Sequence, residues 1–567
     1  MLGGKPSKHP SSLQGDSRRG NGDNPSLCRA GITVSIHQLE ARRQAVQRHL
    51  DAQKSLPERN RFGQFATPHA LALEMAHCLA ACWKQGDTNV RFADPAVGTG
   101  SFYSAALQVF GPGRIASAVG IEVDPRFHAA ANNLWASRGL QLVQGDFTEW
   151  IADRVGVNQP NLILANPPYV RHHHVPRGEK ERLRRLIRKT CGVEVSGLAG
   201  LYVYFLLLVT AWMKDGGLAA WLVPSEFMDV NYGAALKQVL TTQVTLERLH
   251  RFDPAIAQFG DALVSSVVLL LRKSPPVPGH TVAFTYGGTL TQPAVTQHIP
   301  VSVLHSARKW TAYPGSNHDR HRAPSGPGEV TLGDLFRITR GIATGANKFF
   351  ILPRAEARRL CLPDSLLRPI LPSPRLLRHT VIERAPDGYP RIDPQLCLLD
   401  CRLPEHTVER CHPPLWEYLR LAQTHGLPDR YLCRKRVPWY RQEQREPAPF
   451  LCTYMGRGQD DHRPFRFIWN RSDAIATNLY LMLFPRTSLA QILEQTPARV
   501  SEIHALLNAV TGYELRQEGR VYGGGLHKIE PGELARISAA RFIERLPGLV
   551  EALGRQDRPL PRSVGLA

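Results

Sequence analysis

Several features are missing from this sequence of 567 residues. No run of about 18 uninterrupted apolar residues occurs, so we expect no transmembrane helix and no membrane partner. The N-terminal segment lacks the apolar core of a secretory leader, and we therefore expect a cytoplasmic protein. No stretch recurs with a period of about 20 to 50 residues, which argues against a solenoid.

Acidic residues are scarce relative to basic ones. The chain has 70 Lys and Arg but only 49 Asp and Glu, which gives a formal net charge of +21 and a sequence pI of about 9.8. Such an excess favours a polyanionic partner, above all nucleic acid. A basic protein without such a partner is the alternative, and the charge says nothing about the fold.

The cysteines are not spaced in a pattern that is typical of a metal site. The ten cysteines are scattered, which in a long chain without a leader favours reduced thiols. Only Cys397, Cys401, Cys411 and His412 cluster, and their spacings of four and ten residues match no common zinc pattern. We therefore expect no metal site.

The distribution of Pro, Gly and charged residues divides the chain into six segments. Pro-rich breaks at 273–282 and 312–328 separate two large regions, and the polar N-terminus is typical of disorder. We predict a disordered tail at 1–33, a basic helical lead-in at 34–60, a first domain at 61–275, a bridging segment at 276–330, a second domain of mixed α+β structure at 331–545, and a C-terminal tail at 546–567. For the basic helix we favour a solvated face, and contact with DNA is the alternative.

Short apolar runs alternate with helical stretches throughout the first domain. This alternation is typical of a mostly parallel sheet with crossover helices, so we predict a doubly wound, Rossmann-like α/β fold. The run 265–271 follows a helix and is expected to be an antiparallel edge strand. The apolar runs are VRFADPA, ASAVGIEVD, LQLVQGD, NLILANPP, GGLAAWLVP and VSSVVLLLRK.

Three acidic residues each stand near the carboxyl end of a predicted strand. Glu122 comes 28 residues after Asp94, and Asp146 comes 24 residues after Glu122. Asp94 can hold a cationic group, Glu122 can accept hydrogen bonds from ribose, and Asp146 can accept one from an adenine amino group. Any one of them alone is more often a solvated acid. Together they predict a nucleoside cofactor, because open α/β sheets bind ligands at that edge.

A fourth strand ends in NLILANPPYV, residues 161–170, and places Asn166 20 residues after Asp146. The side-chain oxygen of Asn166 and the carbonyl oxygen of Pro167 can each accept a hydrogen bond. The pair Pro167 and Pro168 restricts the backbone. Two such acceptors can grip both hydrogens of a planar amine and make its nitrogen nucleophilic. Tyr169 offers a flat face on which a base can stack.

The stretches GQFATP, DPAVGTGSF, GIEVD, GDF and NPPY, in this order, resemble the gamma class of adenine-N6 DNA methyltransferases. That group includes the TaqI enzyme and the Eco57I-type methylases of Type II restriction-modification systems. The resemblance covers about residues 60–273. It implies a class I methyltransferase domain at 61–275, S-adenosylmethionine as the cofactor, and a target-recognition domain at 331–545. It also implies direct methyl transfer to adenine N6, without a metal or a covalent intermediate.

The resemblance assigns the cofactor site residue by residue. Two departures are visible, because Val97 stands where the family often has Cys and Thr99 where it often has Ser. The implied cofactor residues are Thr67 at the methionine carboxylate, Asp94, Ala96, Val97, Gly98 and Gly100 around the methionine part, Glu122 at the ribose, and Asp146 and Phe147 at the adenine.

The target base is assigned in the same way. Asn166, Pro167, Pro168 and Tyr169 match the site of the target amine, and Phe259 matches an aromatic residue that packs against the extruded adenine. A core position is the alternative for Phe259. A base in a duplex must leave the helix to react, at a cost of a few kcal/mol. Two aromatic faces, at about 1–3 kcal/mol each, can offset that cost.

The segment after Tyr169, VRHHHVPRGEKERLRRLIRKT, is strongly basic. Three consecutive His residues cannot easily converge on one metal ion, and no carboxylate or Cys spacing supports a metal. We instead expect a loop that contacts DNA phosphates, with Arg171, Arg177 and Arg182 as the contacting residues.

Two stretches of the second domain, 332–352 and 519–534, look like parts of a target-recognition region. Glycine turns there allow a phosphodiester to approach, and a cation can pair with it, although structural turns are the alternative. The implied DNA-binding residues are Gly341, Gly345, Lys348, Tyr522 and Gly524.

The expected substrate is double-stranded DNA, and a cognate restriction endonuclease encoded nearby is an expected partner without direct contact. Other enzymes that use Asn-Pro-Pro-Tyr methylate a protein glutamine amide or an RNA base, and these stay open. So does a DNA-binding subunit with a degenerate pocket, although the intact acids and Asn166 argue against it.

Overall fold

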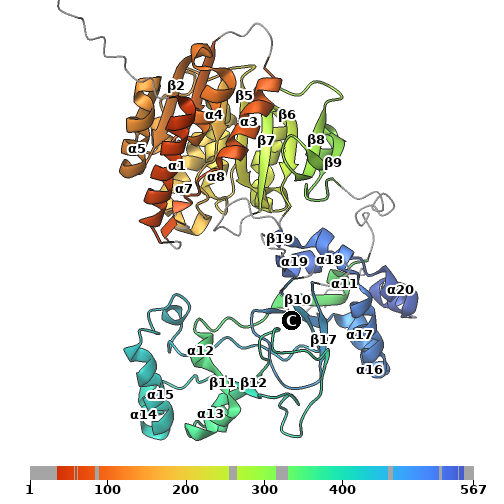
Figure 1. The fold of residues 1–567 in the computed structure, drawn as a ribbon. Coiled ribbons are helices and arrows are strands. Elements are labelled where there is room, and N and C mark those ends of the chain that lie inside the picture. Colours follow the sequence, from red (N-terminus) through yellow and green to blue (C-terminus); the bar gives the residue numbers. More distant parts are fainter. Residues whose placement is uncertain are drawn as a thin grey trace, which may run out of the picture.

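The computed structural model describes residues 35–55, 58–59, 62–83, 89–253, 265–314, 330–457, 464–522, 526–546 and 548–554. Two units follow one another along the chain and lie end to end (Figure 1). The first unit is built on one large sheet, and the second on three smaller ones. Among the described residues, no helix combines the length and the apolar character needed to cross a membrane.

Nine described strands form the sheet of the first unit, in the order β3-β2-β1-β4-β5-β7-β6-β8-β9. Strands β1 to β5 run parallel, and β7 runs antiparallel to both β5 and β6. The strand order reverses between β1 and β4, and ligands of open α/β sheets bind outside the carboxyl ends at such a reversal. The strands are β1 (Val90–Asp94), β2 (Ile115–Glu122), β3 (Leu140–Gln144), β4 (Leu162–Ala165), β5 (Leu218–Pro224), β6 (Thr245–Arg251), β7 (Ser266–Arg272), β8 (Thr281–Gly288) and β9 (Pro293–Pro300).

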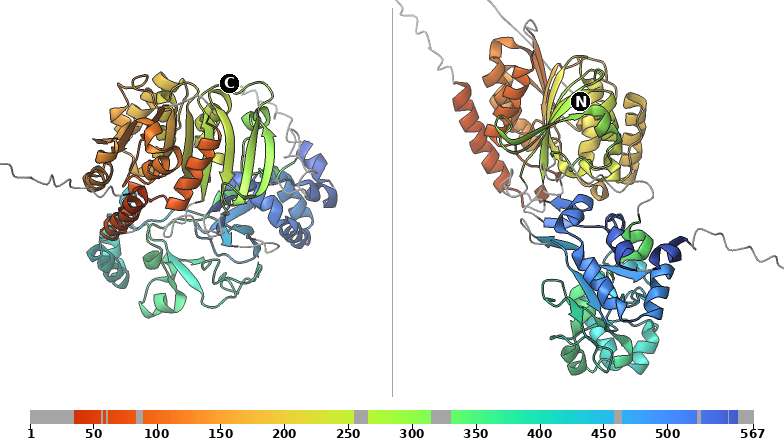
Figure 2. Two further views of the ribbon diagram at one scale, coloured as in Figure 1. Left: turned by 45° about the horizontal axis from the view of Figure 1, so that its top comes forward. Right: turned by 90° about the vertical axis from the view of Figure 1, so that its right-hand side faces the viewer.

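Helices cover both faces of this sheet, so its central strands are buried on both sides (Figure 2). In β4, Leu162 and Leu164 belong to one core, and Ile163 and Ala165 belong to the other. That alternation explains the continuous apolar run of this strand. One face carries α1 (Ile36–Ala52), α3 (His69–Ala81), α4 (Ser101–Phe110) and α5 (Pro125–Trp135); the other carries α6 (Phe147–Trp150), α7 (Arg177–Cys191), α8 (Leu201–Trp212), α9 (Ala234–Thr242) and α10 (Val301–Ser306).

The turns that follow the strands have identifiable local causes. Asp124 accepts a hydrogen bond from the Arg126 N–H and caps α5, and Pro125 occupies its first turn. Gly100 has φ +89°, and a Cβ there would lie 2.4 Å from Trp135 Nε1. Only glycine therefore fits at the start of α4, where the chain passes directly over Trp135.

The end of the sheet differs from the sequence-based expectation. The run 265–271 is antiparallel as predicted, but β7 lies between β5 and β6, so its place at an edge was wrong. Strand β6 was not predicted. Strands β8 and β9 lie within the expected bridging segment and continue the same sheet.

Helix α1 packs on the first unit, against α4 and α5. Ser35 caps it through a capping box with Gln38, and Leu39, Glu40 and Arg43 are buried. The solvated basic face expected for this helix is present, because Arg42 and Arg48 are exposed, and the opposite side of the helix packs in the protein interior.

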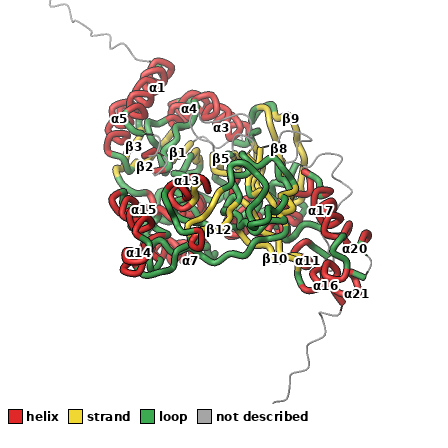
Figure 3. Tube along the Cα trace, turned by 90° about the horizontal axis from the view of Figure 1, so that it is seen from below, coloured by secondary structure: helices red, strands yellow, loops and turns green. Residues whose placement is uncertain are grey.

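The second unit has mixed α+β structure, which confirms the predicted fold class. Its sheets have the orders β10-β18-β15-β17-β13, β11-β14-β12 and β16-β20-β19. Helices α14 and α15 lie on one side, and α16, α17, α20 and α21 lie on the other (Figure 3). The last helix, α21, falls within the predicted C-terminal tail and packs on α16 and α20.

The described strands of this unit are β10 (Phe336–Arg340), β11 (Ile351–Pro353), β12 (Leu367–Ile370), β13 (Val381–Ile382), β14 (Leu396–Leu399), β15 (Phe450–Thr453), β16 (Met455–Arg457), β17 (Phe467–Asn470), β18 (Tyr480–Pro485), β19 (Arg520–Tyr522) and β20 (Leu526–Lys528). The helices are α11 (Leu332–Leu335), α12 (Asn347–Phe350), α13 (Arg354–Arg359), α14 (Glu405–Cys411), α15 (Pro413–Thr424), α16 (Thr487–Gln495), α17 (Arg499–Ala509), α18 (Gly512–Glu518), α19 (Pro531–Leu534), α20 (Ala540–Arg545) and α21 (Leu549–Gly554).

Polar contacts connect the two units. Arg308, just after α10, places Nη2 3.0 Å from Glu518 Oε2 at the end of α18. Arg536 donates to the same carboxylate at 2.8 Å, and Lys309 donates to the backbone oxygens of Glu518 and Gly519. The units therefore meet beside α18 and α19 (Figure 1).

Candidate cofactor and target-base site

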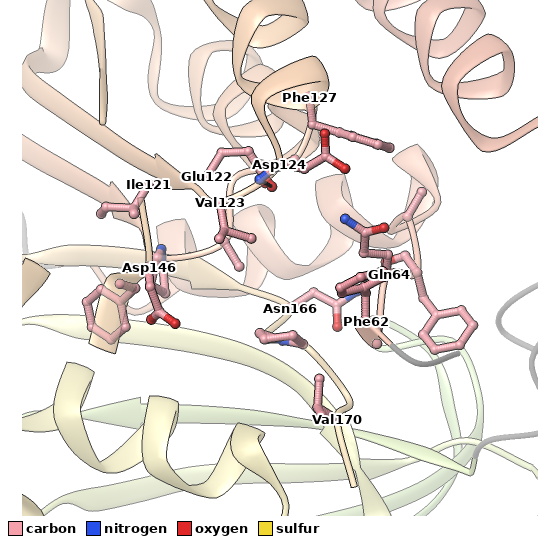
Figure 4. A pocket seen from close by; sticks show the side chains of 18 of the residues that line it. Phe62, Gln64, Ile121, Glu122, Val123, Asp124, Phe127, Asp146, Asn166 and Val170 are labelled. Carbon is pink, nitrogen blue, oxygen red and sulfur yellow. Dashed lines mark hydrogen bonds between the residues drawn. The ribbon is translucent and has the colours of Figure 1, made fainter. Parts of the chain in front are cut away.

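A cavity of about 550 Å³ lies at the carboxyl ends of β1 to β4. We call it the cofactor cavity. Figure 4 shows Glu122, Asp146 and Asn166 around the same space. The sequence placed these three residues at the ends of strands, and in the structure they line one cavity. The lining residues are Gln47, Asp51, Lys54, Glu58, Phe62–Ala66, Pro95, Ala96, Gly98, Ile121–Phe127, Gly145–Phe147, Asn166, Pro168, Val170, Leu201 and Phe205.

Glu122 closes the glycine turn. Its Oε2 accepts a hydrogen bond from the Gly98 N–H at 2.9 Å, and its Oε1 accepts one from the Asp124 N–H at 2.8 Å. Gly98 has φ +56°, a left-handed conformation that favours glycine. Burial raises the pKa of Glu122, and the two N–H donors oppose that shift. Each carboxylate oxygen keeps a lone pair with which it can accept from a ribose hydroxyl.

Asp146 and Phe147 follow β3. Asp146 Oδ1 caps α6, because it accepts from the Thr148 N–H at 2.7 Å and from the Thr148 hydroxyl at 2.8 Å. Its second oxygen is left to accept from an amino group in the cavity. Phe147 is 1% exposed, and its ring lies 5.1 Å from that of Phe205, which also lines the cavity. These two rings form an apolar wall beside Asp146.

Four of the predicted cofactor residues do not line the cavity. Val97 is buried and packs against Gly120, and Gly100 packs against Trp135. Asp94 is 1% exposed: its Oδ1 accepts from the Ala96 N–H, and its buried Oδ2 has no hydrogen-bond partner among the described residues. Burial raises the pKa of Asp94 to about 8. Thr67 is buried as well. Direct contact between these residues and a cofactor stays a prediction.

Asn166 is held in one orientation. Its Nδ2 donates to the Phe65 backbone oxygen at 2.9 Å and to Thr67 Oγ1 at 3.1 Å. Both amide hydrogens are therefore occupied, and Oδ1 remains as an acceptor for a ligand. The two partners come from the stretch GQFATP, about 100 residues earlier in the chain. The geometry thus shows that this stretch orients the Asn166 side chain.

Tyr169 is mostly covered. Its ring is 8% exposed and belongs to the core, its hydroxyl donates to the Leu222 backbone oxygen at 3.1 Å, and it does not line the cavity. The Phe65 ring lies 5.9 Å away from it and does line the cavity. Pro168 also lines the cavity, whereas Pro167 does not. Phe259 lies outside the described residues, so its role stays a prediction. The stacking role of Tyr169 also stays a prediction, because its ring is covered in this structure.

The charges of the cofactor cavity suit a cation. Five carboxylates line it, against two cationic side chains, Lys54 and Arg126. S-adenosylmethionine carries a positive sulfonium and an ammonium group, together with the ribose hydroxyls and adenine amino group that Glu122 and Asp146 can accept. The residues present therefore fit this cofactor. The carboxylates are those of Asp51, Glu58, Glu122, Asp124 and Asp146.

Helix α1 supplies residues that the sequence did not reveal. Lys54, just after α1, is 7% exposed, and its Nζ lies 2.5 Å from both Asp124 Oδ2 and Gln64 Oε1. Nζ also lies 5.7 Å from the centre of the Phe62 ring and 5.1 Å from that of Phe127. Lys54 thus joins three segments of the cavity wall.

The pairing with Lys54 changes the acidity of Asp124. Burial raises the pKa of Asp124, but the hydrogen bonds from Lys54 and Arg126 outweigh that effect and bring it to about 2. A second contact fixes α1 to the glycine turn. Arg43 donates to Thr99 Oγ1 at 3.0 Å, and the Thr99 hydroxyl donates to Gln47 at 2.7 Å.

The predicted phosphate-binding arginines have different surroundings. Arg171 is exposed, and Arg177 is 94% exposed and pairs only loosely with Glu181 at 3.1 Å. Arg182 is partly buried and donates to Glu179, to the Thr148 backbone oxygen at 3.1 Å and to the Thr148 hydroxyl at 2.8 Å. Arg182 therefore supports the loop that carries Asp146. DNA contacts by all three stay predictions.

The residues of the second unit that were predicted to contact DNA also lie in different surroundings. A Cβ on Gly341 would lie 2.2 Å from the Thr477 backbone oxygen, so packing within the protein accounts for this glycine. Gly345 has φ +87°, and Gly345 and Lys348 line a second cavity. Tyr522 ends β19, and Gly524 lies outside the described residues. Among the described residues, Gly341, Gly345 and Lys348 do not line the cofactor cavity.

Two family models match this chain. Residues 132–257 match the Eco57I restriction-modification methylase, and residues 308–556 match the C-terminal domain of Type II methyltransferase M.Eco57I. The chain is 30% identical over 484 residues to Type II methyltransferase M.XamI of Xanthomonas campestris pv. amaranthicola, which covers 84% of this chain and 85% of the relative. The chain belongs to the Eco57I-type Type II methyltransferases.

A second relative agrees with this family, and a solved structure agrees with the fold. Type II methyltransferase M.AccI of Acinetobacter calcoaceticus is 22% identical over 508 residues, with 86% of this chain and 87% of the relative covered. The Type IIL restriction-modification enzyme MmeI, solved in complex with DNA, is 11% identical with a TM-score of 0.52. That match covers 79% of this chain and 66% of the longer chain, and it supports the fold alone.

The family fixes the general chemistry of the site. The methyltransferase uses S-adenosylmethionine as its methyl donor, as the resemblance predicted. When bound, this cofactor supplies an electrophilic methyl group on a positively charged sulfur. The fold and the cofactor are therefore confirmed, and the individual site residues are left to the geometry described above.

Proposed function

We propose that this methyltransferase modifies the N6 amino group of adenine in double-stranded DNA, at a specific sequence. The observation that carries the proposal is the fixed Asn166. Its two amide hydrogens are bonded to Phe65 and Thr67, so that Oδ1 is left as an acceptor, and Asn166 lines the cavity together with Glu122 and Asp146. The net charge of +21 supports a polyanionic substrate.

The target amine has two acceptors in this proposal. Asn166 Oδ1 takes one N–H of the amine, and the Pro167 carbonyl oxygen takes the other. Both acceptors draw the hydrogens out of the plane of the base, which concentrates the nitrogen lone pair toward the cofactor cavity. Holding the amine in that direction is the main contribution of these residues to the rate. The proton released on methylation leaves to solvent.

The reacting base has to leave the duplex, at a cost of a few kcal/mol. Phe65 lines the cavity together with Asn166, and the covered ring of Tyr169 lies 5.9 Å behind the Phe65 ring. A base stacked on such a ring recovers about 1–3 kcal/mol. We propose that Tyr169 becomes more exposed when the base enters, and that Phe259 covers the opposite face of the base.

The proposal extends to the organisation of the chain. Residues 61–275 would form the catalytic domain and 331–545 the target-recognition domain; residues 1–33, expected from the sequence to be a tail, lie outside the described residues. A restriction endonuclease that cuts the same sequence would act beside the methyltransferase, without binding it. This can be tested with a nuclease encoded next to the gene for this chain. The nuclease should cleave unmodified DNA but not DNA that the methyltransferase has modified.

The experiment for the main proposal uses purified protein, isotopically labelled S-adenosylmethionine and a long duplex DNA. Digestion to nucleosides and mass spectrometry should find labelled N6-methyladenine. Labelled cytosine would contradict the adenine assignment. Label in RNA or in a glutamine-containing protein, with none in duplex DNA, would overturn the substrate class.

A further inference from the structure

A second cavity, of about 750 Å³, lies in the C-terminal unit and differs in charge from the cofactor cavity. No carboxylate is among the described residues that line it, although carboxylates dominate the other cavity. Lys348, Arg430 and His425 line it instead. The other lining residues are Ala343–Asn347, Phe349, Leu421, Ala422, Leu427, Leu432 and Asn478. An anionic ligand suits such a site, whereas a cation does not.

One wall of the second cavity is the turn 343–349, and this turn is rigid. Arg436 donates to the Thr344 backbone oxygen at 2.7 Å and to the Ala343 backbone oxygen at 2.8 Å. The Thr344 hydroxyl donates to Asn347 Oδ1 at 2.6 Å. Phe349 stacks on Tyr418 with a centroid distance of 4.5 Å and an interplanar angle of 11°. A preformed wall of this kind loses little conformational freedom when a ligand binds.

Asn478 lies beside this turn with its side chain free to bind. Its backbone N–H donates to the Ile342 backbone oxygen at 2.8 Å, and its backbone oxygen accepts from Arg340 at 3.0 Å. Within the described part of the chain, its side-chain amide makes no hydrogen bond. An amide with both a donor and an acceptor available matches the N7 and N6 atoms of adenine.

A surface that reads DNA needs two kinds of group. Cations without carboxylate partners can contact phosphates and position the protein, and an amide with free donors and acceptors can contact bases and specify the sequence. We propose that the second cavity is a sequence-reading site for duplex DNA. Asn478 reads the edge of a purine base, and Lys348 and Arg430 contact the neighbouring phosphates. This inference rests on the proposed function, since it names the residues that select the DNA to be methylated.

The position of the cavity agrees with this role. Helices α12 and α15, which carry part of its lining, lie on the same side of the molecule as α1, α5 and α7 of the first unit (Figure 1). The contacts between the units lie on the other side, beside α18 and α19. A duplex on the open side could therefore reach both cavities.

The test measures binding separately from methylation. Duplexes that bind the full-length protein are selected from a pool with randomised positions, and their sequences are compared between the wild type and Asn478→Ala. We expect the variant to lose its preference at one base pair, with discrimination reduced about 5- to 150-fold. Asn478→Asp keeps the size of the side chain but only accepts hydrogen bonds, and it should shift the preference toward cytosine at that position.

The phosphate contacts are tested by the salt dependence of duplex binding. Lys348→Ala and Arg430→Ala should weaken binding to every sequence and reduce the slope of log K against log salt by about 1 each. Arg410→Ala, on exposed α14 and outside the cavity, is the matched control and should leave the slope unchanged. Cofactor binding and thermal melting show that each variant is folded.

The outcomes separate the two proposals. An unchanged sequence preference in both Asn478 variants, or slopes for Lys348→Ala and Arg430→Ala equal to that of the Arg410→Ala control, would overturn the reading site. If the wild type selects DNA sequences and the variants behave as expected, but no adenine is methylated, the proposed function fails while the reading site stands.

Discussion

Asn166 Nδ2 lies 3.1 Å from Thr67 Oγ1, although the two residues are 99 positions apart in the chain. Thr67 precedes α3, and Asn166 follows β4 at the reversal of strand order. The contact orients the asparagine amide, and it joins the stretch GQFATP to the proposed site of the target amine. Most of the proposed chemistry depends on this orientation, because a rotated amide would present donors to an amine that needs acceptors.

Thr67→Val keeps the shape of the side chain and removes the hydroxyl. One amide hydrogen of Asn166 then loses its partner, so the amide is held less firmly, and we expect kcat to fall by about 10-fold or more. The KM for S-adenosylmethionine should change little. Steady-state kinetics with varied cofactor measures both values. If Thr67 instead binds the methionine carboxylate, KM will rise and kcat will hold.

Asn166→Ala removes one acceptor of the target amine. We expect methylation to fall by about 100-fold or more, in line with other preorganised polar groups at reacting centres. Cofactor binding by calorimetry and duplex binding by anisotropy should stay within about twofold of the wild type, because the side chain contributes little binding of its own. Full activity in this variant would contradict its proposed role.

Lys54→Met removes the cation that joins α1, Gln64 and Asp124. Asp124 keeps Arg126 as a partner, so the change removes hydrogen bonds to a charged group rather than leaving a buried charge unpaired, and the free energy of unfolding should decrease by about 1–3 kcal/mol. Because these segments line the cofactor cavity, the KM for S-adenosylmethionine should also rise, with kcat at saturation nearly unchanged. Arg42→Ala, exposed on the same helix, is the control. A stability loss without a change in KM would limit Lys54 to a structural role.

Asp94 should make stability depend on pH. Burial raises its pKa in the folded protein to about 8, above an unfolded value of about 3.9. Between those pH values the folded protein keeps a proton that the unfolded chain releases, so stability falls as pH rises, by up to about 1.4 kcal/mol per pH unit. Repulsion from the nearby Glu122 carboxylate also raises the pKa of Asp94.

Asp94→Asn removes that dependence while keeping an oxygen for the Ala96 N–H. Thermal unfolding from pH 5 to 9 should therefore show the variant gaining stability relative to the wild type as pH rises. A parallel fall of both proteins across the whole range would mean that Asp94 ionises freely in the folded state.

The sequence predicted the parts of the site that stand at strand ends. Glu122, Asp146 and Asn166 could be placed together because each follows a short apolar run, and parallel strands bring their carboxyl ends to one edge. The apolar run of β4 is continuous because both of its faces are buried. These features depend on local pattern and on a general rule of topology, so no long-range contact had to be known.

Other parts could not be predicted, because they depend on packing between distant segments. Nothing in the residues near Lys54 marks it as a buried cation, since its partners Gln64 and Asp124 come from other elements. Strand β6 carries Glu247, Arg248 and Arg251 among its apolar residues, and this pattern does not stand out as a strand. The near-complete burial of Tyr169 likewise follows from Leu222 and the surrounding core.

The central claim is that Asn166 and Pro167 grip the amino group of an adenine that has left the duplex. A structure of the protein with a non-reactive cofactor analogue and a duplex containing the target sequence tests it most directly. We expect an extruded adenine whose N6 atom lies about 3 Å from both Asn166 Oδ1 and the Pro167 carbonyl oxygen. An adenine still stacked in the duplex, or an N6 atom out of reach of Asn166, would contradict it.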